Sequence, residues 1–89
     1  MVEVRFAKAF KRHVDCPDSD ATGATVAEVL GAYFDRQPAA RSYVLDESGA
    51  VRKHVAVFHN SDQLVDRVRL TDPVDDGDRI DVFQALSGG

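Results

Sequence analysis

Residues 25–38 have the sequence TVAEVLGAYFDRQP, which carries the strongest secondary-structure signal of the chain. Apolar side chains recur at positions 26, 29, 30, 33 and 34, which is the spacing of one face of an α-helix. Thr25 and Glu28 match the capping-box pattern, in which the threonine hydroxyl accepts from the third helical residue and the glutamate reaches back. Pro38 pushes the residue before it out of the helical conformation. We therefore predict one amphipathic helix that begins after Thr25 and ends before Pro38.

Two strands are expected before this helix and a loop after it. The alternation of apolar and polar residues in VEVRF, residues 2–6, is typical of a half-buried strand, which we expect to continue toward Phe10. A second strand between residues 11 and 23 is expected to be short, because Pro17 and the polar residues after it interrupt any alternation. Residues 42–50 are expected to form the loop.

Three more strands are predicted after that loop. Residues 51–58 are rich in valine and precede the turn-forming residues 60–62, which indicates a third strand. Residues 64–65 are expected to form a small edge strand, and residues 75–78 a tight turn with a glycine available for positive φ. The last strand is predicted over residues 79–85.

The predicted order of elements is strand, strand, helix, strand, short strand, strand. One amphipathic helix is enough to cover one face of one sheet. We therefore predict an α+β fold, with a mixed sheet of four to five strands and one main helix packed across it. The length of 89 residues allows a single domain, expected over residues 1–86, with a flexible tail at 87–89.

The composition limits the classes of partner. The net charge of −4 argues against nucleic acid, and the acidic surface is expected either to keep the protein soluble or to steer it toward a basic partner. No stretch is long and apolar enough to cross a bilayer, and Cys16, the single cysteine, allows no intramolecular disulfide. We expect a cytoplasmic protein that does not bind membranes and is a monomer when free.

The pair Gly88-Gly89 is the first candidate for chemistry. Without side chains, these residues form a thin thread that fits a narrow cleft in which any Cβ would clash. The α-carboxylate is ionised at neutral pH and can attack the α-phosphorus of ATP to form an acyl-adenylate. Residues 76–78 are acidic and the chain has no phosphate-binding loop, so activation would come from another protein. The alternative is a frayed terminus or an artificial chain boundary without function.

The C-terminal part of the chain resembles a known family. Residues 70–83 are LTDPVDDGDRIDVF and residues 85–89 are ALSGG, and this ending is similar to that of ubiquitin-like sulfur carriers of the MoaD/ThiS family. Residues 54–60, HVAVFHN, also resemble the family's central strand and asparagine turn, especially in the branch of the cysteine-biosynthesis carriers. Together with the capped helix, the resemblance extends over nearly the whole chain.

This resemblance implies a β-grasp fold and a specific chemistry. In the family, an E1-like enzyme uses ATP to adenylate the terminal glycine, which is then converted to a thiocarboxylate that donates sulfur. Gly88 and Gly89 match the functional pair, and the carrier itself binds no cofactor. Many relatives have prolines before the tail, where this chain has residues 83–86, FQAL, so the identity of the partner enzyme stays open. Asn60-Ser61 lacks the glycine that commonly follows the asparagine, which is expected to change only the turn.

The last predicted strand places Phe83 on the outer face of the sheet. Ile80 and Val82 are expected to face inward, so Phe83 is an apolar residue on the face that should meet water. The alternative is that Phe83 covers an edge of the sheet. The partner-binding approach to the tail is expected to comprise Phe83, Ala85, Leu86 and Ser87.

Three other features predict no chemistry. Cys16 is expected to be an unreactive loop residue, since no positive group or helix end nearby lowers its pKa. His54 and His59 are expected on opposite faces of a strand, and neither has a cysteine or carboxylate at ligand spacing, so no metal site is predicted. Residues 75–78 lack the loop of a calcium site.

Three functions remain open from the sequence. The first is a sulfur carrier, a protein co-substrate and not an enzyme, whose partners are an E1-like enzyme that uses ATP and a sulfur source, and a biosynthetic enzyme that accepts the sulfur. The second is a ubiquitin-like modifier joined through Gly89 to lysines. The third is a non-covalent interaction module. The pathway that receives the sulfur is not predicted by any residue.

Overall fold

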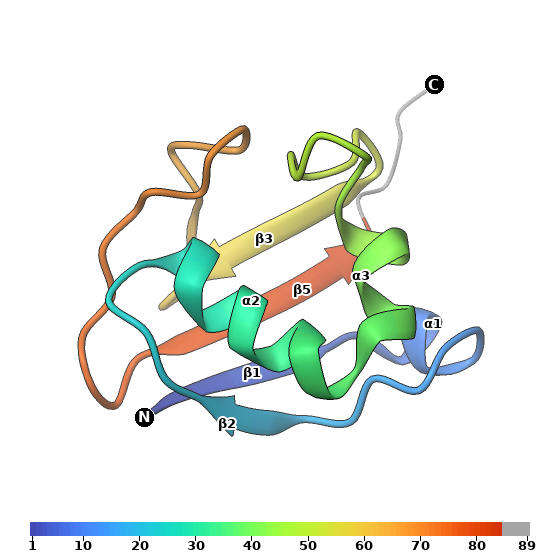
Figure 1. Ribbon diagram of the computed structural model, residues 1–89, viewed down its shortest axis with the longest axis horizontal. Coiled ribbons are helices and arrows are strands. Elements are labelled where there is room, and N and C mark those ends of the chain that lie inside the picture. The colour runs from blue at the N-terminus through green and yellow to red at the C-terminus, as the bar shows by residue number, and fades with distance from the viewer. Residues whose placement is uncertain (85–89) are drawn as a thin grey trace.

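A five-stranded mixed sheet forms the framework of the fold (Figure 1). The structure is a computed structural model and describes residues 1–84. The strands are β1 (Val2–Phe6), β2 (Ser19–Ala21), β3 (Val55–His59), β4 (Asp62–Gln63) and β5 (Arg79–Gln84). Their order is β2-β1-β5-β3-β4, in which β1 and β5 are parallel and the other neighbours are antiparallel. The predicted mixed sheet is confirmed.

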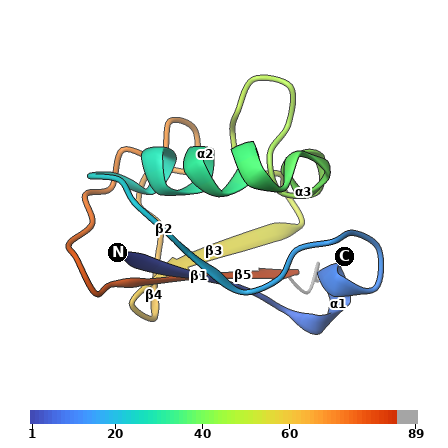
Figure 2. The same ribbon diagram turned by 60° about the horizontal axis from the view of Figure 1, so that its bottom comes forward.

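The helix α2 (Val26–Arg36) lies across one face of this sheet, as Figures 1 and 2 show. The Glu28 N–H donates to the Thr25 hydroxyl at 3.2 Å, and the Ala24 N–H donates to the Glu28 carboxylate at 3.3 Å. These bonds confirm the predicted cap, although the glutamate reaches the residue before Thr25. The helix ends before Pro38, as predicted.

Two short helices differ from the prediction. The strand β1 ends at Phe6 and is followed by the helix α1 (Lys8–Lys11), because a helical turn buries Phe10, which the sequence pattern assigns to a longer strand. The helix α3 (Pro38–Val44) occupies part of the predicted loop. Pro38 both ends α2 and begins α3, since its fixed φ suits the first turn of a helix and its missing N–H is not needed there. None of the helices in residues 1–84 is long and apolar enough to cross a membrane.

The hairpin of β3 and β4 begins and ends at other residues than predicted. The strand β3 starts at Val55 and not at Val51, which lies in an isolated bridge. Asn60 and Ser61 have φ angles of 49° and 77°, the region that two-residue hairpin turns require. This turn lets pairing resume at once, so β4 begins directly after it, earlier than the sequence predicts.

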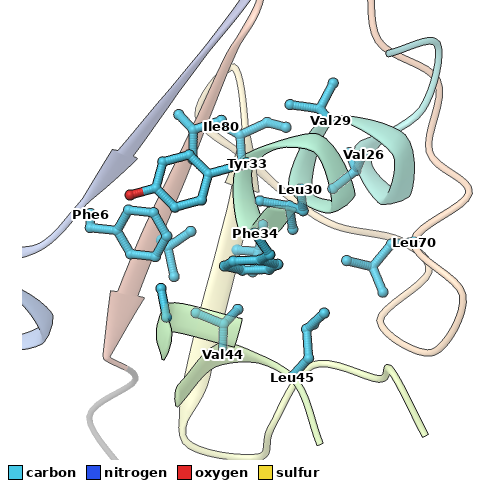
Figure 3. Close-up of a cluster of buried hydrophobic side chains, with 14 of the residues drawn as sticks. Phe6, Val26, Val29, Leu30, Tyr33, Phe34, Val44, Leu45, Leu70 and Ile80 are labelled. Atoms are coloured by element: carbon cyan, nitrogen blue, oxygen red, sulfur yellow. The ribbon is translucent and has the colours of Figure 1, made fainter. Parts of the chain in front are cut away.

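The core lies between α2 and the inner face of the sheet. Figure 3 shows Tyr33 and Phe34 of α2 beside Phe6 and Ile80, and the ring centroids of Tyr33 and Phe6 are 5.1 Å apart. The predicted inward orientation of Ile80 and Val82 is confirmed, because both are fully buried. The main helix and the central strands are thus joined by one apolar layer.

Cys16 belongs to this core although it lies in a loop. Its side chain is buried, and the next residue, Pro17, accepts a hydrogen bond from the Tyr33 hydroxyl at 2.7 Å. Burial raises the pKa of the Cys16 thiol, which disfavours the reactive thiolate. This environment supports the prediction that Cys16 is unreactive.

Candidate functional site

The strand β5 brings the chain toward its C-terminus from the centre of the sheet. Gln84 pairs with Val55 of β3, and on the other side the Ala7 N–H donates to the Val82 carbonyl at 2.9 Å. Because β1 and β5 are parallel, the end of β5 lies at the same edge of the sheet as the end of β1 and the helix α1 that follows it (Figures 1 and 2). Pairing on both sides therefore fixes the position from which the chain continues.

Five of the residues predicted to form the site lie outside the described residues: Ala85, Leu86, Ser87, Gly88 and Gly89. The roles predicted for them stay predictions, as does the expected domain boundary after residue 86.

Phe83 lies on the open face of the sheet near the end of the central strand β5, and the residue is 44% exposed. The alternative that it covers a sheet edge is wrong, because β5 is bordered by both β1 and β3. Its ring packs edge-to-face on that of Phe58, with centroids 5.6 Å apart and planes at 79°. Phe58 was not among the predicted site residues, although its position between inward-facing Val57 and the asparagine turn places it on the outer face.

Charged side chains share the sheet face with this pair of aromatic rings. Arg79 Nε lies 2.7 Å from an Asp81 carboxylate oxygen, and Arg5 Nη2 lies 3.1 Å from a Glu3 oxygen. Alternation along β1 and β5 puts all four of these side chains on the same face as Phe83. An apolar centre with a charged rim is the usual anatomy of a protein-binding surface. The open sheet face at β5 is therefore suited to docking.

The opposite end of β5 is held by polar contacts between two turns. His59 Nε2 lies 2.7 Å from an Asp78 carboxylate oxygen, and the Asp75 N–H donates to the same carboxylate at 2.8 Å. The Asp75 N–H, Asn60 and His59 together lower the pKa of Asp78 to about 2. The carboxylate partner of His59 is 19 residues away in the chain, so spacing along the sequence could not reveal it.

The acidic run before β5 is a turn, as predicted. Gly77 has a φ of 90°, and the Asp78 N–H donates to the Asp75 carbonyl at 3.1 Å. Within residues 1–84, no three histidine, cysteine, aspartate or glutamate side chains are grouped so that they could hold a metal ion.

Comparison with known proteins adds a relationship that covers the whole chain. The sequence profile of the ThiS family matches residues 7–89. Small archaeal modifier protein 3 of Haloferax volcanii is 34% identical over 94 residues, which cover 99% of this chain and 98% of that protein.

Solved structures share the fold. A chain of the Amycolatopsis orientalis BexX/CysO complex matches with a TM-score of 0.83 at 23% identity and covers 100% of both chains. SAMP1 of Haloferax volcanii matches with a TM-score of 0.76 at 25% identity, over 99% of this chain and 98% of the other. These likenesses confirm the predicted β-grasp fold. Because the family profile extends from residue 7 through the glycine pair at residues 88–89, this chain belongs to the ThiS family of small ubiquitin-like carrier and modifier proteins.

Proposed function

We propose that the chain is a sulfur carrier whose Gly89 carboxylate is adenylated by an E1-like enzyme and converted to a thiocarboxylate. One observation carries the proposal: the central strand β5, which is held on both sides and precedes the family's glycine pair in the chain, carries Phe83, which packs on Phe58 on the open face of the sheet. The protein presents the reacting group, and the partner enzyme supplies ATP and the sulfur source.

The chemistry needs only a carboxylate and access to it. A Gly89 carboxylate oxygen attacks the α-phosphorus of ATP, pyrophosphate leaves, and a mixed anhydride with AMP remains. A sulfur nucleophile such as hydrosulfide then attacks the carbonyl carbon, AMP leaves, and the thiocarboxylate forms. Gly88 contributes by having no side chain, which lets the tail enter a narrow active site.

Phe83 and Phe58 are the proposed docking surface for the adenylating enzyme. Phe83 is exposed and Phe58 is half-buried, and on docking such aromatic side chains bury a large apolar area at little cost in side-chain entropy. Ala85, Leu86 and Ser87 would extend this contact toward the active site of the enzyme. The charged rim of the sheet face would set the orientation of the two proteins.

A second function keeps the activation step and changes the acceptor. Small archaeal modifier protein 3, a relative at 34% identity, is named as a modifier, and an acyl-adenylate reacts with a lysine amine as well as with sulfur. In this case, Gly89 would be joined to lysines of other proteins.

Intact-protein mass spectrometry separates these functions. The protein ending at Gly89 is incubated with ATP, sulfide and lysate of the source cells. Replacement of one oxygen by sulfur supports the carrier, and conjugates linked through Gly89 to lysines support the modifier. An unchanged mass in every lysate that adenylates a known family member would contradict both and favour a non-covalent module.

Two tail variants test whether Gly89 is the reacting group. One carries an additional residue after Gly89, and the other replaces Gly88 by valine. Both should fold like the wild type and fail to be adenylated, because the carboxylate is displaced or a Cβ blocks its entry. Adenylation of the extended protein without trimming would exclude the proposed mechanism.

A further inference from the structure

A cleft of about 450 Å³ lies on the helical side of the molecule, away from the open sheet face. Its walls come from α2, from α3 with the loop after it, and from the segment at residues 69–70. This volume falls within the range of natural binding pockets. The cleft is not part of the tail or of the surface around Phe83, so the proposed sulfur chemistry leaves it without a role.

The floor of the cleft is apolar and is held in place by backbone contacts. Figure 3 shows Phe34, Leu45 and Leu70 converging beside Leu30. Leu70 has a φ of 55°, an unfavourable conformation for a bulky residue. The Ala27 N–H of α2 donates to the Leu70 carbonyl at 2.9 Å, which holds this segment against the first turn of the helix. The apolar floor is therefore a built feature of the fold.

Gly31 keeps the cleft open. It lies in the middle of α2, where glycine is a poor helix former, and it is exposed at the cleft. A Cβ at this position would meet no atom within 4 Å, so packing within residues 1–84 does not require a glycine. The missing side chain leaves space for an occupant from outside.

The rim of the cleft carries two arginines without acidic partners. Arg41 on α3 and Arg69 are exposed, and neither lies within 4.0 Å of a carboxylate in residues 1–84, whereas Arg5 and Arg79 elsewhere form ion pairs. Asp35 is the one acidic residue among those that line the cleft. The cleft is thus locally basic on a chain with a net charge of −4.

We propose that this cleft binds a short acidic segment of a partner protein. An apolar side chain of the segment would rest on Phe34 and Leu70 over Gly31, and its carboxylates would contact Arg41 and Arg69. The helical face and the sheet face point in opposite directions (Figure 2), so the segment can stay bound while the sheet face is occupied. The proposal does not depend on the tail chemistry.

Nuclear magnetic resonance titration tests the cleft with three synthetic peptides. The first has two leucines flanked by aspartates and glutamates, the second has lysines in place of the acidic residues, and the third has serines in place of the leucines. The first peptide should shift the amide signals of Gly31, Arg69 and Leu70 below about 1 mM, and the other two should bind at least about tenfold more weakly. Added salt should weaken the binding of the first peptide, because salt screens the attraction between exposed charges.

Variants of the chain make the test specific. Gly31→Leu fills the cleft and should abolish binding while the helix is kept, since leucine is a better helix former than glycine. The double variant R41S/R69S should bind the acidic peptide at least about fivefold more weakly than the wild type. Arg12→Ser, at an exposed arginine outside the cleft, should bind this peptide like the wild type. The proposal is overturned if the acidic peptide causes no shifts, if the lysine peptide binds equally well, or if Gly31→Leu binds like the wild type in a folded spectrum.

Discussion

At the scale of single residues, Asp78 shows how one carboxylate can join two turns. It accepts from the Asp75 N–H within its own turn and contacts His59 at the end of β3. The side-chain Oδ1 of Asn60 meanwhile accepts from the Arg79 N–H at 2.8 Å, so the same two turns are joined twice. These contacts fix the start of β5, and through it the register of the strand that leads to the tail.

The lowered pKa of Asp78 predicts a pH dependence of stability. Its folded-state pKa of about 2 lies below the ordinary value of 3.8, so the fold favours the ionised form. The resulting stabilisation is fully present above about pH 4 and is lost as the pH falls toward about 2. In urea unfolding, the free-energy difference between wild type and Asp78→Asn should therefore shrink over this interval.

Asp35→Asn is the control, since Asp35 is exposed and its carboxylate contacts no partner atom in residues 1–84 closely enough to bond. The free energy of unfolding of Asp35→Asn should differ little from that of the wild type at neutral pH. A difference for Asp78→Asn that is equally small at pH 7 would contradict the assigned role of Asp78.

Replacement of Gly23 and replacement of Gly31 by alanine should change the free energy of unfolding in opposite directions. A Cβ at Gly23 would lie 2.7 Å from the Glu28 Cβ and 2.7 Å from the Val29 backbone nitrogen, so the start of α2 would have to shift. Gly23→Ala should lower the free energy of unfolding by about 1–3 kcal/mol. Gly31→Ala should raise it by about 0.5–1 kcal/mol, because alanine suits a helix better and nothing lies in its way.

Chemical denaturation of both variants checks this pair, with each serving as the control of the other. If Gly23→Ala is as stable as the wild type, a Cβ at position 23 does not clash with the start of α2, and the prediction is wrong.

At the scale of elements, three hydrogen bonds from two parts of the chain, the segment at residues 70–72 and the cap residue Thr25, satisfy the N-terminus of α2. The Val26 N–H donates to the Asp72 carbonyl at 3.0 Å, the Ala27 N–H to the Leu70 carbonyl at 2.9 Å, and the Glu28 N–H to the Thr25 hydroxyl at 3.2 Å. These are the N–H groups that a helix cannot satisfy by itself. Only the third of these bonds could be predicted from the sequence, because its partner is three residues away.

Removal of the cap should destabilise the helix and with it the domain. Thr25→Ala leaves the Glu28 N–H without its side-chain acceptor, and we expect the free energy of unfolding to fall by about 1 kcal/mol. Thr22→Ala, at an exposed threonine just before the helix, should change it by less than about 0.5 kcal/mol. Thermal or urea unfolding measures both, and equal losses in the two variants would show that the hydroxyl of Thr25 has no special role.

The short helices mark where local patterns were insufficient. Phe10 is apolar whether it continues a strand or closes a helical turn, so alternation alone predicts the wrong structure for it. The helix α2 ends before Pro38, as predicted. The residues after it form α3, because this helix buries Ala40 and Val44 against the core. Burial by distant parts of the chain decided both cases.

At the scale of the whole molecule, the sheet separates two surfaces with different chemistry. The open face carries the aromatic pair of Phe58 and Phe83, and the helical face carries the cleft lined by Arg41 and Arg69. In the proposed function, the protein would meet an activating enzyme and later an acceptor, and two separate surfaces would serve these two contacts. The proposed roles can be tested separately because no residue belongs to both.

The proposed docking role of Phe83 predicts a selective defect. Phe83→Ser should raise the KM of the adenylating enzyme for this protein by about tenfold with little change in kcat, because the proposed role of Phe83 is to bind the enzyme and not to take part in the reaction. Tyr43→Ser is a matched control, since Tyr43 is 42% exposed against 44% for Phe83 but lies on α3. Steady-state adenylation kinetics measure both, and equal KM values for the two variants would rule out Phe83 as an anchor.

The elements that could be predicted from the sequence are those whose signals lie within a few neighbouring residues. The capped helix after Thr25, the inward residues of β5 and the turn at Gly77 follow from spacing and backbone preferences within a few residues, and the glycine pair at 88–89 indicates the family. The order of the strands could be seen only in the tertiary structure. The contact of Phe58 with Phe83, the contact of His59 with Asp78 and the cleft at Gly31 depend on this arrangement. Such contacts join segments far apart in the chain, and their formation depends on the summed packing of the core and not on the pattern of any one segment.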